Sequence, residues 1–256
     1  MYKGKKIICV IPARLASTRF PEKILASLCG KPLIQRVFEA ATKCSCFDKV
    51  IIALDDDKTA LVVKEFTDQF MMTPPSCQNG TERLSYVKNR LGPIGDIWVN
   101  WQADEPFIDE SIIHALLSNL DGGASIWTLK RKITDEAELL NSNIVKVVTD
   151  KNDNALYFSR SLIPFNRDRK LANIYYKHIG LYAYSTEALS LIEGFESCEI
   201  ELTESLEQLR FLYHGLKIQV ATSPYETIGI DRKEDLEKST IEFLNRYKTP
   251  LVGNAQ

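Results

Sequence analysis

Long apolar runs alternate with amphipathic stretches over the first half of the chain. Residues 6–13, KIICVIPA, are almost continuously apolar, which is typical of a strand covered on both faces. Residues 48–55 and 96–102 repeat this pattern, and residues 33–43 place their apolar side chains on one helical face. Strands that alternate with helices in this way predict an α/β fold with a mostly parallel sheet.

The pattern changes between about residue 125 and residue 185. Strand-like stretches at 144–150, 155–159 and 176–184 follow one another there, with turns between them and little helix. Helix and strand signals return afterwards, and no Gly/Ser-rich linker, repeat or low-complexity segment interrupts the chain. We therefore predict a single domain over residues 1–256 with an embedded β-rich sub-region at about 125–185.

Composition narrows the classes of protein that fit this pattern. The 256 residues are 45% hydrophobic and 26% charged, which is typical of an ordered globular protein. A formal net charge of -2 gives no reason to expect nucleic acid or an anionic membrane as a partner. No stretch approaches the roughly 20 apolar residues of a membrane-spanning helix, so we expect no membrane insertion. The six cysteines lack CxxC spacing, which favours reduced thiols in a cytoplasmic protein.

The loop after the first predicted strand concentrates positive charge. Residues 12–23, PARLASTRFPEK, hold Arg14, Arg19 and Lys23 at the carboxyl edge of the predicted sheet, where α/β proteins usually bind ligands. Guanidinium and ammonium groups bind phosphate oxygens, and three cations match a triphosphate. The loop lacks the glycine spacing of a dinucleotide site or a P-loop. A solvated loop without a ligand accounts for its composition equally well.

Two further strand exits carry carboxylates. Asp104 lies in QADEP, residues 102–106, and Asp231 follows an apolar stretch near the C-terminus. Mg²⁺ is commonly held by one or two carboxylates, with substrate oxygens and water completing its shell, so these aspartates could hold it together. Glu105 is the weaker candidate because the proline after it restricts its backbone. An acidic turn or a helix cap is the competing explanation for both aspartates.

Two more groups of polar residues suggest ligand contacts. Residues 79–83, NGTER, form a turn whose backbone could contact a nucleobase, and Thr81 is expected to cap the following helix. The second group consists of His178, Tyr182, Glu207 and Gln208. Their side chains suit a polyhydroxy acid, but a plain loop and structural roles remain open for both groups, since a lone histidine is more often structural.

Eight stretches in order make the chain similar to a known family. It resembles the 3-deoxy-manno-octulosonate cytidylyltransferases, the CMP-Kdo synthetases, in register from about residue 7 to residue 240. The stretches are IPARLASTRFPEK, GKPLIQRVFEAA, NGTERL, NWQADEPFI, ALYFSRSLIPF, YKHIGLYAY, LEQLRFLYHG and IDRKEDLE. The resemblance implies a nucleotidyltransferase-type, three-layer, mostly parallel α/β sheet whose β-rich insertion serves sugar binding and dimerisation.

The resemblance also implies a reaction. CTP and 3-deoxy-D-manno-octulosonate (Kdo) would give CMP-Kdo and pyrophosphate, which activates Kdo for lipopolysaccharide synthesis, with Mg²⁺ as cofactor. The anomeric hydroxyl of Kdo would attack the α-phosphorus of CTP while cations stabilise the leaving pyrophosphate.

Site residues follow from the positions that match the family's motifs. The implied nucleotide contacts are Pro12, Ala13, Arg14, Arg19, Lys23, Asn79, Gly80, Thr81 and Arg83. The implied sugar contacts are Gln102, Arg160, His178, Tyr182, Glu207 and Gln208. Catalysis is assigned to Arg14, Arg19, Lys23, Asp104 and Asp231, and the last two are also the implied Mg²⁺ ligands.

The chain departs from the family pattern at three positions. The family usually has glycine where this chain has Glu22 and Ala103, and serine where it has Asn79. Because glycine tolerates positive φ, the first two changes leave open a nucleotide-binding relative with impaired turnover. A cytidylyltransferase for another sugar acid, 8-amino-Kdo or a sialate, is the other alternative, although Glu105 favours Kdo. The preference for cytosine over uracil rests on the resemblance alone.

The β-rich sub-region also bears on assembly. Its stretch IGLYAY, residues 179–184, carries apolar side chains in a pattern that a monomer would leave partly exposed. We therefore predict a two-fold homodimer.

Overall fold

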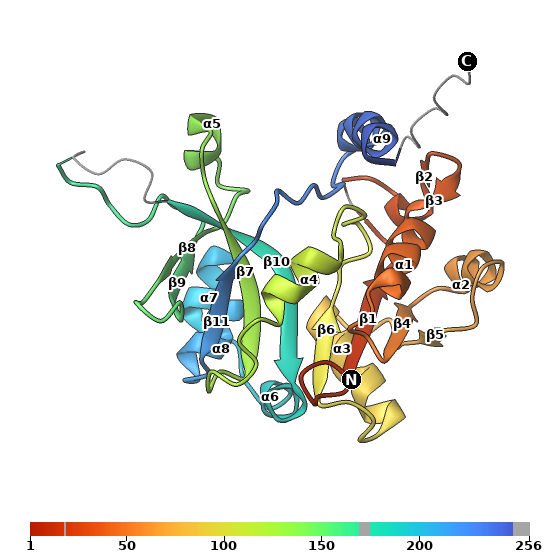
Figure 1. Cartoon of the computed structure of the whole chain (residues 1–256), viewed down its shortest axis with the longest axis horizontal. Coiled ribbons are helices and arrows are strands. Elements are labelled where there is room, and N and C mark those ends of the chain that lie inside the picture. Colours follow the sequence, from red (N-terminus) through yellow and green to blue (C-terminus); the bar gives the residue numbers. More distant parts are fainter. Residues whose placement is uncertain (18, 169–174, 248–256) are drawn as a thin grey trace, which may run out of the picture.

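A mixed sheet of nine strands forms the centre of the computed structural model, which describes residues 1–17, 19–168 and 175–247 (Figure 1). Its strands are β1 (Ile7–Ala13), β4 (Lys49–Leu54), β5 (Phe70–Met72), β6 (Ile97–Asn100), β7 (Ile126–Lys132), β8 (Lys146–Thr149), β9 (Ala155–Ser159), β10 (Tyr176–Ser185) and β11 (Ile218–Thr222). A separate hairpin pairs β2 (Ser27–Leu28) with β3 (Lys31–Pro32). The 3-10 helix η1 (Lys23–Leu25) lies between β1 and β2. The α-helices are α1 (Leu33–Lys43), α2 (Asp57–Lys64), α3 (Gly80–Leu91), α4 (Glu110–Leu116), α5 (Glu136–Leu139), α6 (Thr186–Ile192), α7 (Glu199–Glu204), α8 (Gln208–Tyr213) and α9 (Lys233–Tyr247).

Strand order confirms the predicted α/β class. The main path through the sheet runs β11-β7-β10-β6-β1-β4-β5, and β8 and β9 extend the sheet beside β10. Along the main path, neighbouring strands are parallel except at β10, which is antiparallel to both β6 and β7. The main path is therefore mostly parallel, and the reversed strand β10 separates two parallel groups, while β8 and β9 add antiparallel pairs beside β10.

Alternation along β1 explains why the first strand is a continuous apolar run in the sequence. Ile7, Cys9 and Ile11 pack into a core with α1 and α4 on one face of the sheet. Ile8 and Val10 pack into a second core with α3, α6 and α8 on the other face. Because helices cover both faces, every position of the strand is buried and none needs a polar side chain.

Several observed boundaries match the predicted ones. The helix predicted over residues 33–43 is α1, and the strand predicted over residues 155–159 is β9. Strands β7 to β10 fall in the region predicted to be β-rich, of which residues 169–174 lie outside the described residues. Local sequence pattern was therefore sufficient to place these elements.

The reason given for a homodimer is wrong, because residues 179–184 are buried within the single chain. Ile179, Leu181, Tyr182 and Tyr184 have at most 8% of their surface exposed. Strand β10 lies between β6 and β7, and both of its faces contribute to the two cores. An apolar alternation that suggested an outer surface is thus part of the interior.

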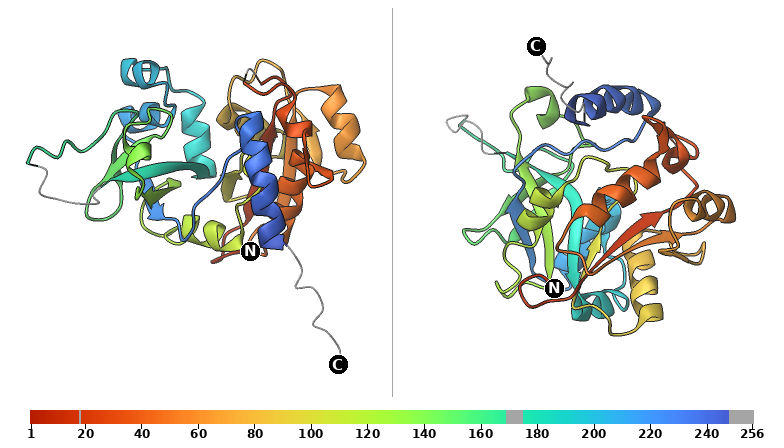
Figure 2. Two further views of the ribbon diagram at one scale, coloured as in Figure 1. Left: turned by 90° about the horizontal axis from the view of Figure 1, so that it is seen from above. Right: turned by 45° about the vertical axis from the view of Figure 1, so that its right-hand side comes forward.

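The last helix closes the structure near the carboxyl end of β1. Leu236 and Phe243 of α9 pack on a small core of Leu28, Leu33 and Ile230, so α9 lies beside the β2–β3 hairpin and the start of α1 (Figure 2). None of the described helices is long and apolar enough to cross a membrane.

Candidate active site

The predicted phosphate loop and both predicted metal ligands line one cavity. It has a volume of about 230 Å³ and lies where β1 and β6 end. Its lining includes Pro12, Arg14, Arg19, Lys23, Gln102, Asp104 and Asp231. Ala13 is the buried last residue of β1. Since α/β proteins bind ligands at the carboxyl edge of the sheet, this cavity is the candidate active site.

Lys23 lies between the two aspartates. Its Nζ is 2.5 Å from Oδ2 of Asp104 and 3.0 Å from Oδ1 of Asp231. Arg19 adds a contact of 3.3 Å from Nη1 to Oδ2 of Asp231. Burial disfavours the charge of Lys23, but the two carboxylates outweigh this effect and raise its pKa above the ordinary value. The ammonium therefore stays charged and is shared by both carboxylates.

Backbone contacts bring Asp231 to this position from the far end of the chain. The amide of Ile230 donates to the carbonyl of Asp104 at 3.0 Å, so the segment before α9 runs along the exit of β6. The turn that leads into α9 is capped by Asp235, whose carboxylate accepts from the amides of Asp231 and Arg232. The carboxylate of Asp231 is therefore left to the cavity, and the helix-cap explanation for it is wrong.

Glu105, the weaker metal candidate from the sequence, is half-buried, and Oε2 of its carboxylate is shielded from solvent. Within the described residues, its Oε2 has no hydrogen-bond partner. Burial raises the pKa of Glu105 to about 8, and the nearby charges of Asp104 and Asp231 act in the same direction. Its main chain is held by a bond from its amide to Gln102 and by the indole of Trp101, which donates to its carbonyl. Apart from the proline that follows, nothing in the sequence indicates that this oxygen is buried.

The NGTER turn forms the amino-terminal end of α3, and its cap differs from the predicted one. The side chain of Asn79 accepts from the amide of Glu82 at 2.8 Å, which makes Asn79 the N-cap. The prediction that Thr81 caps this helix is wrong. Its hydroxyl instead donates to Oε2 of Glu207 at 2.7 Å. This bond connects the predicted base-binding turn directly to the predicted sugar-binding residues.

Gly80 lets the start of α3 approach the strand ends closely. A Cβ at this position would lie 3.0 Å from Nδ2 of Asn100 and 3.3 Å from both Nε2 of Gln102 and the ring of Pro12. Such distances are tighter than ordinary carbon contacts, so a larger residue would displace the helix or its neighbours. The amides of the α3 amino terminus therefore lie beside the cavity because position 80 has no side chain.

Arg83 does not point freely into the cavity. Its guanidinium donates to Oδ2 of Asp55 at 2.7 Å and to the hydroxyl of Thr73 at 2.5 Å, and only 3% of the side chain is exposed. Asp55 also accepts from the amide of Leu15 at 3.0 Å, so it ties the phosphate loop to α3. Sequence reasoning missed Asp55, although its place directly after β4 is the same signal that identified Asp104.

An aromatic row leads from the cavity region into the β-rich part. The rings of His178, Tyr182 and Tyr184 follow one another at centroid distances of 5.3 and 5.7 Å. Burial lowers the pKa of His178 to about 3, so its ring is neutral, and Nε2 lies 3.0 Å from the hydroxyl of Thr128. The buried hydroxyl of Tyr182 has no hydrogen-bond partner among the residues that the structure describes.

The remaining predicted sugar contacts lie at the start of α8 and the end of β9. Glu207 pairs with Arg210 at 3.0 Å, and burial raises its pKa. Gln208 is buried in the first turn of α8. The guanidinium of Arg160 donates to carbonyls of Ser142, Glu204 and Ser205, so its donors serve the protein in this conformation.

The two departures from the family's glycines differ in their consequences. Glu22 has a φ of 54°, a conformation that glycine adopts more easily, and its carboxylate pairs with Lys58 at 2.5 Å. Ala103 is buried but is not among the residues with positive φ, so the loss of glycine strains nothing there. Of these two departures, only Glu22, next to Lys23, therefore carries backbone strain.

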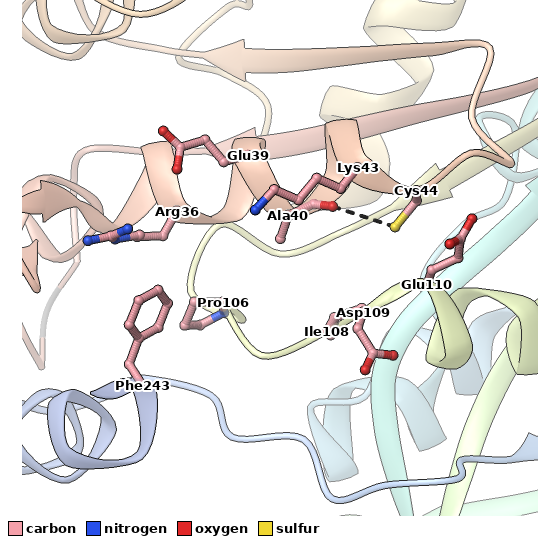
Figure 3. A pocket seen from close by; sticks show the side chains of 10 residues that line it. All are labelled: Arg36, Glu39, Ala40, Lys43, Cys44, Pro106, Ile108, Asp109, Glu110 and Phe243. Atoms are coloured by element: carbon pink, nitrogen blue, oxygen red, sulfur yellow. Dashed lines mark hydrogen bonds between the residues drawn. The ribbon is translucent and has the colours of Figure 1, made fainter. Parts of the chain in front are cut away.

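A larger cavity of about 380 Å³ lies between α1, the segment 106–110 and Phe243 of α9 (Figure 3). Three of its charged side chains are already engaged. Arg36 donates to carbonyls of the β2–β3 hairpin, Asp109 caps α4, and Glu110 accepts from Ser45. The smaller cavity is the better candidate because its cations and carboxylates converge on open space.

The chain is similar to characterised families over nearly all of its length. A family model described as Cytidylyltransferase matches residues 8–218. Two relatives named 3-deoxy-manno-octulosonate cytidylyltransferase, from Parabacteroides distasonis and Bacteroides thetaiotaomicron, are 43% and 47% identical. The alignments cover 94% and 93% of this chain and 99% and 98% of the relatives.

Solved structures agree with these matches. A structure of CMP:2-keto-3-deoxy-manno-octonic acid synthetase complexed with CTP superposes with a TM-score of 0.89 at 36% identity, covering 94% of this chain and 99% of the other. A 4-diphosphocytidyl-2C-methyl-D-erythritol synthase from Anaerococcus prevotii is 13% identical over 94% of this chain and 99% of its own, and with a TM-score of 0.62 it shares the fold. The chain therefore belongs to the 3-deoxy-manno-octulosonate cytidylyltransferase family.

Proposed function

We propose that this protein transfers CMP from CTP to Kdo, giving CMP-Kdo and pyrophosphate. The observation that carries the proposal is the single cavity in which Arg14, Arg19 and Lys23 meet Asp104 and Asp231. Membership of the family and the CTP complex of its structural relative support CTP as the nucleotide. The names of the relatives support Kdo as the acceptor.

The residues of the chain divide the work between phosphate, base and sugar. Arg14, Arg19 and Lys23 bind the triphosphate and stabilise the charge that develops on the departing pyrophosphate. The amino terminus of α3, held close by Gly80, receives the cytidine. Tyr182 and the neighbouring polar side chains orient the sugar acid, whose anomeric hydroxyl attacks the α-phosphorus as the bond to pyrophosphate breaks.

Asp104 and Asp231 fit Mg²⁺, and we propose that they hold it. The two carboxylates already share one cation, the ammonium of Lys23. Within the described residues, no group of three His, Cys, Asp or Glu side chains could hold a metal, which suits an ion that takes its other ligands from substrate and water. When bound, Mg²⁺ would neutralise phosphate charge and polarise the reacting oxygens.

Pyrophosphate release tests the function. Purified protein with CTP and Mg²⁺ should release pyrophosphate when Kdo is added, and 8-amino-Kdo and a sialate should be poorer acceptors. Pyrophosphate release with one of these acids but not with Kdo would assign a different sugar acid. No pyrophosphate release with any of the acids would indicate a nucleotide-binding relative with impaired turnover. If UTP supports turnover as well as CTP, the proposed base pocket is wrong.

We also propose a homodimer in the cytoplasm, on grounds other than residues 179–184. Leu156 of β9 and Leu202 of α7 are 61% and 67% exposed, and Phe165 is 86% exposed. The hydroxyl of Ser159 at the end of β9 donates to the carboxylate of Glu204 at the end of α7, so these two ends lie next to each other. Exposed apolar side chains on the β-rich half are suited to contact with a second copy of the chain.

A further inference from the structure

Lys23 stands where a divalent cation would stand. Its ammonium is within hydrogen-bond distance of one oxygen of Asp104 and one of Asp231, and these are the two carboxylates that fit a metal. Only 11% of the Lys23 side chain is exposed. The same two oxygens cannot bind the ammonium and a metal ion fully at the same time.

We propose that Lys23 occupies the metal position in the nucleotide-free protein and moves to the triphosphate when CTP and the metal bind together. The inference rests on the proposed function, since it takes Asp104 and Asp231 as the metal ligands. Lys23 and the metal ion compete for the same two carboxylates. Lys23 therefore opposes binding of the metal alone and favours binding of the metal together with the nucleotide.

The charges around the cavity explain why a substitute cation is needed. Two carboxylates without a partner would repel each other in a partly buried place. Apart from Lys23, Asp231 pairs with Arg19 at 3.3 Å among the described residues, and both of these side chains are 60% exposed. Lys23 therefore supplies most of the compensation for Asp104, and an arriving phosphate can draw it away only if another cation replaces it.

Arg14 provides the contrast that makes the idea testable. It lines the same cavity, but it makes no ion pair with any residue that the structure describes. Replacing Arg14 removes one positive charge from the cavity without freeing either aspartate. Replacing Lys23 removes the same charge and frees both.

The experiment measures Mn²⁺ binding without nucleotide, by the loss of the electron paramagnetic resonance signal of free Mn²⁺. Lys23→Gln should bind Mn²⁺ at least about tenfold more tightly than the wild type, because a competing charge at contact distance is gone. Arg14→Gln, the matched control, should change the affinity by less than about threefold, since screening weakens a more distant charge. In the presence of a chelator, the melting temperature of Lys23→Gln should be lower than that of the wild type. Added Mn²⁺ should raise the melting temperature of Lys23→Gln by more than it raises that of the wild type.

Each outcome decides. Equal Mn²⁺ affinities for Lys23→Gln and the wild type, or an equal gain in Arg14→Gln, would overturn the competition while leaving the proposed function intact. If none of the three proteins binds Mn²⁺, both the assignment of Asp104 and Asp231 as metal ligands and the competition by Lys23 are wrong. Pyrophosphate release then still tests the proposed reaction independently. If Lys23→Gln does not fold in chelator, Lys23→Met keeps the apolar stem; failure of Mn²⁺ to restore either variant also overturns the inference.

Discussion

Asp104 and Asp231 share one ammonium, so each contributes charge at the position where the phosphates and metal must meet. Asp104→Asn keeps the shape of the side chain and removes its charge. We expect turnover to fall by at least about 10²-fold, the effect of losing one strong transition-state contact. Binding of CTP without metal should change far less, because the cations of the loop remain. Steady-state kinetics and calorimetric titration with CTP measure the two quantities.

Asp109→Asn is the matched control for that variant. Asp109 lies five positions further along and caps α4 by accepting from the amide of Ser111 at 3.0 Å. A weakened cap lowers the free energy of unfolding by up to about 1 kcal/mol and leaves turnover nearly unchanged. If Asp104→Asn behaves like Asp109→Asn, the role of Asp104 is structural and the metal assignment fails.

The neutral ring of His178 makes stability depend on pH. Its pKa is about 3 in the folded protein and 6.5 when exposed. Between these values the unfolded chain binds a proton that the folded chain does not, so this contribution is complete above pH 6.5 and is lost as the pH falls towards 3. From about pH 7.5 to about pH 5, the wild type should lose about 2 kcal/mol more stability than His178→Gln. Urea unfolding at both pH values tests this, and parallel losses would contradict it.

The sequence was sufficient to predict which residues lie near the cavity. It was not sufficient to predict which of their side chains pair with each other. Parallel strands end at one edge, so Arg14, Lys23 and Asp104 could be placed together from strand order alone. The pairing of Arg83 with Asp55 and the burial of Oε2 of Glu105 depend on contacts between segments far apart in sequence. Single-residue patterns carry no information about such contacts, so Arg83 was assigned to the nucleotide without its partner.

At the scale of elements, α3 is positioned by one glycine. In Gly80→Ala, the new methyl group would press on Pro12 and on the amide of Asn100. Since crowding of this kind costs about 1 kcal/mol or more, we expect CTP to bind at least about fivefold more weakly. Titration with CTP measures the loss, while the melting temperature should change little because alanine favours helix.

Gly194→Ala controls for a general effect of replacing glycine. Its nearest neighbour would be the carbonyl of Leu191 at 3.6 Å, an ordinary contact outside the cavity. CTP affinity should match that of the wild type. Equal CTP affinity in Gly80→Ala as well would mean that the start of α3 does not contact the nucleotide.

Predictions about helices and strands were correct where neighbouring residues set the structure. They were wrong where contacts between distant segments set it. The apolar face of α1 is set by neighbouring residues along the chain, and the prediction of this helix was confirmed. Thr81 was a reasonable cap by residue type, but Asn79 took that role and Thr81 bonded to Glu207. For β10, alternation suggested one exposed face, and insertion between β6 and β7 buried both.

At the scale of the whole molecule, the exposed apolar surface of the β-rich half predicts assembly. The wild type should sediment at twice the chain mass of 29.1 kDa at micromolar concentration. Leu156→Asp should shift it to the monomer, because a charge in an apolar interface is costly to bury. Leu61→Asp, at a similarly exposed leucine on α2, should not. A wild type that sediments at 29.1 kDa would contradict the dimer.

The reversed strand β10 also sets how the protein can move. It pairs with β6 of the nucleotide-binding group on one side and with β7 of the β-rich group on the other, so the two groups are joined by hydrogen-bonded sheet. Rotation of one half against the other would have to bend the shared strand β10. The two halves are therefore not expected to rotate freely about a hinge. We therefore expect movements that accompany substrate binding to be confined to segments outside the sheet, such as η1, which carries Lys23.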